Sequence, residues 1–308
     1  MPLPVILMYH SVDDRSGRSD TWNLSVSPDN FAGQVEALVS ERTVVPLEEL
    51  ARCVRAGRIP RKYASITFDD GYANNLIIAK PILERYNAPA TLFLMTAATN
   101  TSGFWWDRLE RIVMDADFVP PMLYITLLDR TLEVRAESGD RKQVFIAIWS
   151  RLRELDVGDR DTAIAYLAGV LAGQPPDPAL RPLTTDEVQR LKHGVFSIGA
   201  HTHSHPSLPR LGPTELMREI ADSKAICESL LNRQITTFAY PFGDYDDRVR
   251  AAVAETGLTV ACTTAHRSVQ PDDDCLALPR MGVSNWTSDQ FIRALPPATI
   301  NKTASQIA

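Results

Sequence analysis

Short apolar runs alternate with amphipathic helical patterns along most of this 308-residue chain. Between the runs, apolar residues such as Phe31, Val35 and Leu38 recur at helical spacing. This alternation is the signature of βα units around a mainly parallel sheet, and it predicts an α/β fold. The predicted strands are residues 4–9, 63–68, 90–95, 195–199, 236–240 and 258–263.

Helix boundaries are marked at several places between these runs. Ser27 followed by Pro28 is a typical helix start, with a capping side chain and a proline at the first helical position. Thr184 and Glu187 have the spacing of a capping box, and Gly194 ends that helix. Two further helices are predicted over residues 214–231 and 248–255.

The segment from Ser102 to Arg181 interrupts this rhythm. It is rich in helix formers and charged residues, shows no strong βα alternation, and closes with Pro-Pro-Asp-Pro at residues 175–178. We expect residues 102–181 to form a mostly helical insertion within one domain that spans residues 1–308.

Composition narrows the class of protein. With 44% hydrophobic and 23% charged residues the chain resembles an ordinary globular protein. The net charge of −6 argues against a partner held mainly through its phosphates, so no nucleic-acid partner is expected. The four cysteines are far apart, which favours buried free thiols over a zinc cluster or disulfides. Without a basic n-region or an apolar run of about 20 residues, we expect a cytoplasmic protein with no spanning segment.

Chemically active side chains follow three of the predicted strands. Asp69 and Asp70 follow the second strand, residues 201–205 follow the fourth, and Pro241 and Phe242 follow the fifth. Function in parallel α/β folds concentrates at the carboxyl ends of strands. Taken singly, a paired aspartate is most often a solvated turn, and a histidine cluster can be a surface loop. Their joint order favours a site in which two histidines and one carboxylate bind a metal while the other carboxylate acts as a base.

Two of these segments carry recognisable motifs. Residues 67–72 read Thr-Phe-Asp-Asp-Gly-Tyr, and residues 201–205 read His-Thr-His-Ser-His. They match the first motif and the His-(Ser/Thr)-x-x-His motif of the polysaccharide deacetylase family, also called the NodB-homology family. The chain resembles this family from about Pro2 to Trp286, interrupted by the insertion. The resemblance implies a distorted (β/α) barrel, often of seven strands, with one bound metal ion.

Carried over by position, the resemblance assigns roles to individual residues. Asp70, His201 and His205 would be the metal ligands, and Asp69 would be the general base. His203 is not a ligand in the family pattern, so we expect it to serve the structure or to hydrogen-bond near the ligands.

The chain departs from the family in its third motif. This motif normally reads Arg-x-Pro-Tyr, whereas residues 239–242 read Ala-Tyr-Pro-Phe. The arginine that orients the base is therefore absent, and Phe242 can offer only its backbone N–H to an oxyanion. Arg280, near a late strand, is our hypothesis for the missing arginine.

The general acid is also displaced. The C-terminal Leu-x-His motif of the family is missing, but His10 ends the first strand in a Leu-Met-Tyr-His run. This resembles the relocated motif of circularly permuted poly-N-acetylglucosamine deacetylases, and it makes His10 the expected general acid. A histidine that only caps the strand end is the alternative, and His266 is a weaker candidate.

Several aromatic residues are candidates for binding the substrate. For Trp105 and Trp106, packing of the insertion against the barrel is favoured over stacking on a sugar, and Trp22 is a further stacking candidate. The residues expected to contact substrate are Tyr72, Tyr240, Pro241 and Trp286.

The resemblance implies a metal-dependent hydrolase that removes the N-acetyl group from an N-acetylated sugar or glycan precursor, in surface polysaccharide biosynthesis. Zinc is the expected metal, since neutral imidazoles suit it, with cobalt, manganese, nickel or iron as alternatives. Two other functions stay open. The chain could hydrolyse another small amide or N-formyl group on the same fold, or it could be an inactive carbohydrate-binding homologue.

Overall fold

Eight of the strands form one curled, fully parallel sheet. A computed structural model of the chain describes residues 3–15, 18–126, 131–135 and 140–296. The short strand β4 (Thr43–Val44) pairs with the beginning of β5. The other seven strands lie in the order β11 (Val260–Cys262), β10 (Thr237–Ala239), β9 (Phe196–Ala200), β6 (Ala90–Leu94), β5 (Tyr63–Phe68), β1 (Val5–Tyr9) and β12 (Met281–Gly282).

The two ends of this sheet are joined by the segment that leads into β12. Leu278 forms a parallel bridge with Cys262 of β11. Its N–H donates to the carbonyl oxygen of Ala261 over 2.8 Å, and its own oxygen accepts from the N–H of Thr263 over 2.8 Å. β12 then pairs with β1, so residues 278–282 connect β11 to β1. The distorted (β/α) barrel of seven strands expected from the sequence is confirmed.

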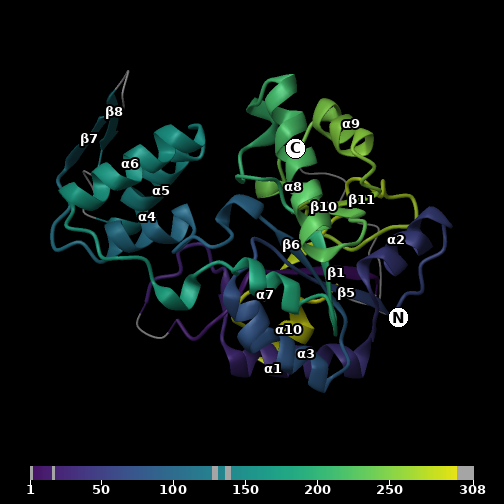
Figure 1. Ribbon diagram of the computed structural model, residues 1–308. Helices are drawn as coiled ribbons and strands as arrows, with labels where there is room; N and C mark the ends of the chain where they lie inside the picture. The colour runs from purple at the N-terminus through teal and green to yellow at the C-terminus, as the bar shows by residue number, and fades with distance from the viewer. Residues whose placement is uncertain (1–2, 16–17, 127–130, 136–139, 297–308) are drawn as a thin grey trace, which may run out of the picture.

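Helices surround the barrel. Figure 1 shows α1, α3 and α10 on one side of the sheet and α8 and α9 on the other. A π-helical turn, Asn75–Ala79, leads directly into α3. The helices of the barrel are α1 (Pro28–Glu41), α2 (Leu47–Arg55), α3 (Lys80–Arg85), α7 (Thr185–Arg190), α8 (Pro213–Leu231), α9 (Asp247–Glu255) and α10 (Ser288–Ala294).

The predicted helix starts are present. The Ser27 side chain accepts a hydrogen bond from the Asn30 N–H over 3.3 Å, with Pro28 at the first position of α1. At α7 the Thr184 side chain accepts from the Glu187 N–H, and the Glu187 carboxylate accepts from the Thr184 N–H, which completes the capping box. Both caps satisfy N–H groups that a helix leaves unpaired.

The barrel strands are buried on both faces. Ile6 of β1 and Phe93 of β6 pack in one cluster with Leu50 of α2, whereas their neighbours along each strand pack in a second cluster with the other helices. Gly199 makes room for this arrangement, because a Cβ there would lie 2.5 Å from the Phe93 ring. Residues buried on two faces explain the continuous apolar runs in the sequence.

The chain between β6 and α7 forms a separate lobe, at the left of Figure 1. It has its own apolar core, which includes Leu109, Phe145 and Leu167. In its described residues the lobe contains three α-helices and, in addition, an antiparallel pair of strands, β7 and β8, which was not expected. The elements of the lobe are α4 (Trp105–Met114), β7 (Met122–Thr126), β8 (Thr131–Arg135), α5 (Arg141–Leu152) and α6 (Val157–Val170).

Two other expectations concern the chain as a whole. All four cysteines are free; Cys227 and Cys262 are buried, and Cys53 and Cys275 are half-buried. Within the described residues, none of the helices combines the length and the apolar character needed to cross a bilayer.

Candidate active site

The proposed chemical groups come together at the carboxyl ends of four strands. β1, β5, β9 and β10 each end beside one pocket with a volume of about 380 Å³. Carboxyl ends of parallel strands meet at one edge of the fold, which is why segments far apart in the sequence meet here. The pocket is lined, among others, by His10, Asp69, Asp70, His201, His205 and Phe242.

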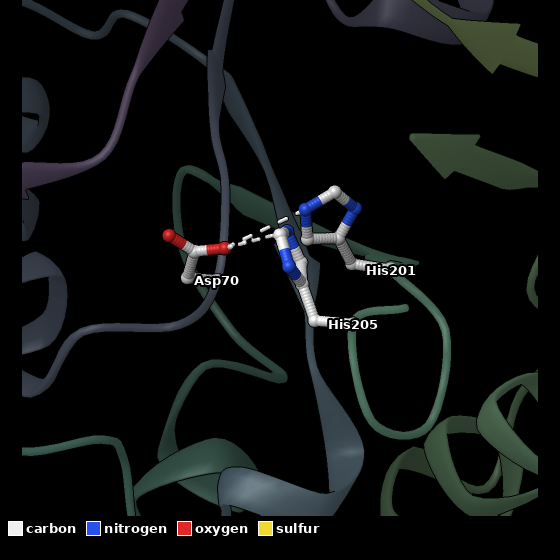
Figure 2. Close-up of side chains that lie close together, drawn as sticks. All are labelled: Asp70, His201 and His205. Atoms are coloured by element: carbon white, nitrogen blue, oxygen red, sulfur yellow. Dashed lines mark ion pairs between the residues drawn. The ribbon is translucent and has the colours of Figure 1, made fainter. Parts of the chain in front are cut away.

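Asp70, His201 and His205 form a compact group of potential metal ligands. Figure 2 shows both imidazoles facing the carboxylate, with Nε2 of His201 3.5 Å and Nε2 of His205 3.7 Å from Oδ1 of Asp70. One ligand atom from each residue lies within 4.8 Å of the others, and all three side chains are buried. Nδ1 of His201 donates to the carbonyl oxygen of Ala239 over 2.8 Å, which orients Nε2 toward the group.

The protonation states of the group also suit a metal site. Burial, followed by the charge of His201, lowers the pKa of His205 to about 3, so this imidazole is neutral near pH 7. Burial would raise the pKa of Asp70, but the hydrogen bond from His201 and nearby charges lower it. Burial would lower the pKa of His201, but the two aspartates raise it. A metal ligand must be deprotonated, so a bound cation would compete with protonation of His201. A carboxylate with two imidazoles therefore fits a divalent cation such as zinc.

The backbone is strained around this group. Asp70, Thr202, His205 and Phe242 have φ angles of 73°, 64°, 58° and 59°. Among the described residues, the other non-glycine positions with positive φ are four asparagines, which tolerate this conformation, and Ala172. Such backbone typically costs about 1–3 kcal/mol per residue and persists only where surrounding contacts enforce it. The strain marks this edge of the barrel as the functional one.

Asp69 lies beside the group and is bound by Arg280. The guanidinium donates to both carboxylate oxygens, with Nη1–Oδ1 2.6 Å and Nη2–Oδ2 2.7 Å. It also donates to the carbonyl oxygen of Thr263 and to the hydroxyl of Thr67, and it is fully buried. Burial would raise the pKa of Asp69, but the Arg280 charge and hydrogen bonds hold it well below its usual range. Arg280 thus lies directly beside Asp69, as its hypothesised role requires.

His10 lines the same pocket as Asp69 and Asp70. Its carbonyl oxygen accepts a hydrogen bond from the Asn75 amide over 2.8 Å, and its half-buried side chain lines the cavity. The two other histidines discussed from the sequence lie elsewhere: Nδ1 of His203 bonds to the Thr96 hydroxyl over 2.9 Å, and His266 is exposed. The structure therefore brings His10, and not His203 or His266, to the pocket.

Of the four residues expected to contact substrate, only Tyr240 lines the pocket. Its hydroxyl donates to the carbonyl oxygen of Leu276 over 2.8 Å. The fully buried Tyr72 does not line it, because its hydroxyl donates to Asp107. Pro241 is buried in the turn beside the pocket. Trp286 packs against the main core and does not line the pocket, since the structure places it over α1.

Two of the pocket residues missed in the sequence come from the insertion. Trp149 and Arg153, from the end of α5 and just after it, line the pocket together with Trp22 and Trp106. The ring of Trp149 lies 4.9 Å from that of Trp22, and the ring of Trp106 lies 4.9 Å from that of His205. Trp106 therefore both packs the insertion against the barrel and reaches the site. The spacing of Trp149 and Arg153 on one helix face was the only available signal.

The fold and the site together define the protein as an α/β barrel with two carboxylates and two histidines buried at the ends of its strands. The family model described as polysaccharide deacetylase matches residues 56–118 and 156–261, which is more than half of the chain. The chain therefore belongs to the polysaccharide deacetylase family. The matched residues contain both aspartates and both histidines of the group, but not His10, Arg280 or residues 119–155 of the insertion.

Individual relatives agree with this assignment. The chain is 24% identical over 281 residues to YxkH of Bacillus subtilis (strain 168), which its name assigns to the polysaccharide deacetylases; the match covers 91% of this chain and 71% of that protein. It is 20% identical over 287 residues to the poly-β-1,6-N-acetyl-D-glucosamine N-deacetylase of Staphylococcus epidermidis (strain ATCC 35984), covering 90% and 74%. The Streptococcus pyogenes deacetylase PplD, solved with acetate, shares the fold with a TM-score of 0.64 at 21% identity, covering 96% and 100%.

Proposed function

We propose that this protein is a metal-dependent N-deacetylase that acts on an N-acetylated sugar or glycan precursor. The observation that carries the proposal is one buried constellation. Asp69, bound by Arg280 through both oxygens, lies beside the Asp70, His201 and His205 group at the bottom of an accessible pocket. A base next to three metal ligands is what hydrolysis of an unreactive amide requires.

Asp70, His201 and His205 would hold the metal. When bound, a divalent cation supplies Lewis-acid polarisation of the amide carbonyl and lowers the pKa of water towards about 7. Zinc is our first choice because two imidazoles and a carboxylate suit it, with cobalt, manganese, nickel or iron as alternatives.

Asp69 acts as the general base. Arg280 keeps this carboxylate ionised and fixes its plane, so that it can accept a proton from the water that attacks the acetyl carbon. The same pairing lowers the pKa of Asp69 and makes it a weak base. It can therefore deprotonate only a water molecule whose own pKa is lowered. The arrangement therefore links the role of Asp69 to an occupied metal site.

His10 and Phe242 complete the mechanism. His10, in its protonated form, donates a proton to the departing amine nitrogen, which leaves as the free amino sugar beside acetate. The backbone N–H of Phe242 donates to the oxyanion of the tetrahedral intermediate, and one such donor is typically worth about 3 kcal/mol. The left-handed turn at Phe242 sets the direction of the peptide groups beside the pocket.

A sugar is the proposed substrate on two grounds. One relative is named for deacetylating poly-β-1,6-N-acetyl-D-glucosamine, and the indole rings of Trp22, Trp106 and Trp149 line the pocket. Flat aromatic rings bind the apolar faces of sugars by stacking. A role in surface polysaccharide biosynthesis and a cytoplasmic location stay predictions.

The experiment that tests the substrate class compares acetate and formate release from sugar and non-sugar amides, all at the same metal loading. Acetate release that is fastest from N-acetylhexosamines supports the proposal. Faster release from N-formyl or non-sugar amides would replace it with a different amidohydrolase. Sugar binding without release of either acid would identify an inactive carbohydrate-binding homologue.

A further inference from the structure

Arg153 reaches from the insertion to the turn that carries Phe242. The Cζ atom of Arg153 lies 4.3 Å from the centroid of the Phe242 ring. Its Nη2 forms an ion pair with Oδ2 of Asp244, and the same oxygen accepts from the Ser207 hydroxyl over 3.0 Å. One side chain of the insertion therefore contacts both the ring and the carboxylate that flank Gly243.

This turn depends on contacts from outside itself. Phe242 adopts φ 59° and ψ 0°, a left-handed conformation that an L-residue with a bulky side chain avoids. Its neighbour Gly243 has φ 76° and lies so close to Thr264 that a Cβ would be 2.1 Å from the hydroxyl. A conformation of this kind is populated only where its surroundings over-determine it.

The ring of Phe242 receives that support mainly from the insertion. Besides Arg153, it contacts the ring of Trp149 at 5.6 Å and that of His205 at 4.5 Å between centroids. Two of these three partners lie in residues 119–155, a part of the chain that the family model leaves unmatched. The insertion is thus joined to the turn by contacts that the matched residues do not contain.

We infer that Arg153 is a positioning residue, which holds the Phe242 turn in its left-handed conformation so that the N–H of Phe242 faces the pocket. The inferred effect of Arg153 on catalysis rests on the proposed deacetylase function. A direct role in substrate binding fits the contacts less well, because the guanidinium is already paired with Asp244 and stacked on Phe242. The insertion, on this account, is part of the catalytic apparatus.

The test compares two ion pairs that connect the insertion to the barrel. Arg153→Ala removes the contact with the turn. Arg210→Ala is the matched control, since Arg210 pairs with Glu154, the next residue along the insertion, over 2.8 Å at an exposed position away from the turn. Arg153→Lys keeps the charge and tests for partial recovery, because an ammonium can pair with Asp244 but cannot stack as a planar group.

The kinetic readout is acetate release by metal-loaded protein. We expect Arg153→Ala to lower kcat at least tenfold with KM within twofold of wild type. Arg153→Lys should recover part of this loss, and Arg210→Ala should stay within twofold in both constants. A raised KM at unchanged kcat would make Arg153 a substrate-binding residue and overturn the inference, as would unchanged constants.

A second readout does not depend on turnover. Hydrogen–deuterium exchange of the peptide that contains residues 240–245 reports on the turn itself, because the N–H groups of Gly243 and Asp244 are hydrogen-bonded within it. We expect faster exchange there in Arg153→Ala than in wild type or Arg210→Ala. Equal exchange in all three would overturn the inference. If the wild type releases no acetate, the proposed function fails, and the exchange data alone decide the role of Arg153.

Discussion

Replacing Arg280 with alanine is expected to abolish most turnover and to lower stability. The guanidinium is fully buried, and it donates to both oxygens of Asp69, to the carbonyl oxygen of Thr263 and to the hydroxyl of Thr67. Its removal leaves the carboxylate of Asp69, itself 4% exposed, without its cation. Breaking a buried pair from one side typically costs about 3–5 kcal/mol, a large fraction of the stability of an ordinary domain.

The effect on activity follows from the same geometry. Burial is the largest influence on the pKa of Asp69 and raises it, so removing Arg280 raises that pKa and leaves the carboxylate less ionised and free to rotate. A misplaced catalytic group commonly costs about 10²-fold, and we expect at least that loss in kcat/KM. Arg280→Lys should be more stable than the alanine variant but nearly as slow, because one ammonium cannot bond to both oxygens.

Urea unfolding and acetate release on the same preparations test this reasoning. In an Asp69→Asn background, Arg280→Ala should cost clearly less free energy of unfolding than in the wild type, because no buried anion is left unpaired. Full turnover by Arg280→Ala, or equal stability costs in both backgrounds, would refute the assignment of Arg280 as the partner of the base.

Three further predictions concern single residues. Asp69→Asn should keep bound metal, measured by elemental analysis, while turnover falls by about 10²–10⁴. Glu187→Gln should lower the free energy of unfolding by about 1 kcal/mol near pH 7. The reason is that hydrogen bonds from the partly exposed Arg181 lower the pKa of Glu187 from 4.5 to about 2. A depressed folded-state pKa contributes stability above pH 4.5 that disappears toward pH 2. The free energies of unfolding of wild type and variant should therefore converge in acid; a difference that does not change with pH would contradict this. Gly199→Ala should lower the free energy of unfolding, measured in urea, by about 1–3 kcal/mol, because the new Cβ would lie 2.5 Å from the ring of Phe93. An unchanged unfolding midpoint would contradict the packing described.

Much of the barrel could be predicted because local patterns and packing agree there. Residues 63–68 form an apolar run followed by two aspartates, and β5 ends at Phe68 as expected. Residues buried on both faces produce long apolar runs, and capping residues such as Ser27 and Thr184 mark helix starts through local hydrogen bonds. Both signals lie within short windows of sequence.

The partners of the site were harder to predict because they depend on the closed barrel. Arg280 meets Asp69 only because residues 278–282 return to pair with β11 and β1. Its place near a late strand raised the hypothesis, but its distance from the base could not be estimated. Trp286 follows β12 and turns onto α1 and away from the pocket, a direction that the local sequence does not encode.

The insertion shows the limit of periodicity. The antiparallel pair of β7 and β8 was missed because its short strands lie in a segment dominated by helix formers. Tyr72, the last residue of the first motif, was expected to contact substrate, yet its hydroxyl bonds to Asp107 of α4, a contact that no local pattern encodes. Trp149 and Arg153 reach the pocket only through the docking of the whole lobe.

The most direct test of the central claim measures acetate released from N-acetylhexosamine substrates by three samples: metal-loaded protein, chelated protein, and chelated protein to which metal is restored. The account predicts release by the loaded sample, loss on chelation, and recovery on restoring the metal, with His205→Ala failing to recover. Release that chelation does not change, or no release by protein that demonstrably holds its metal, would contradict it.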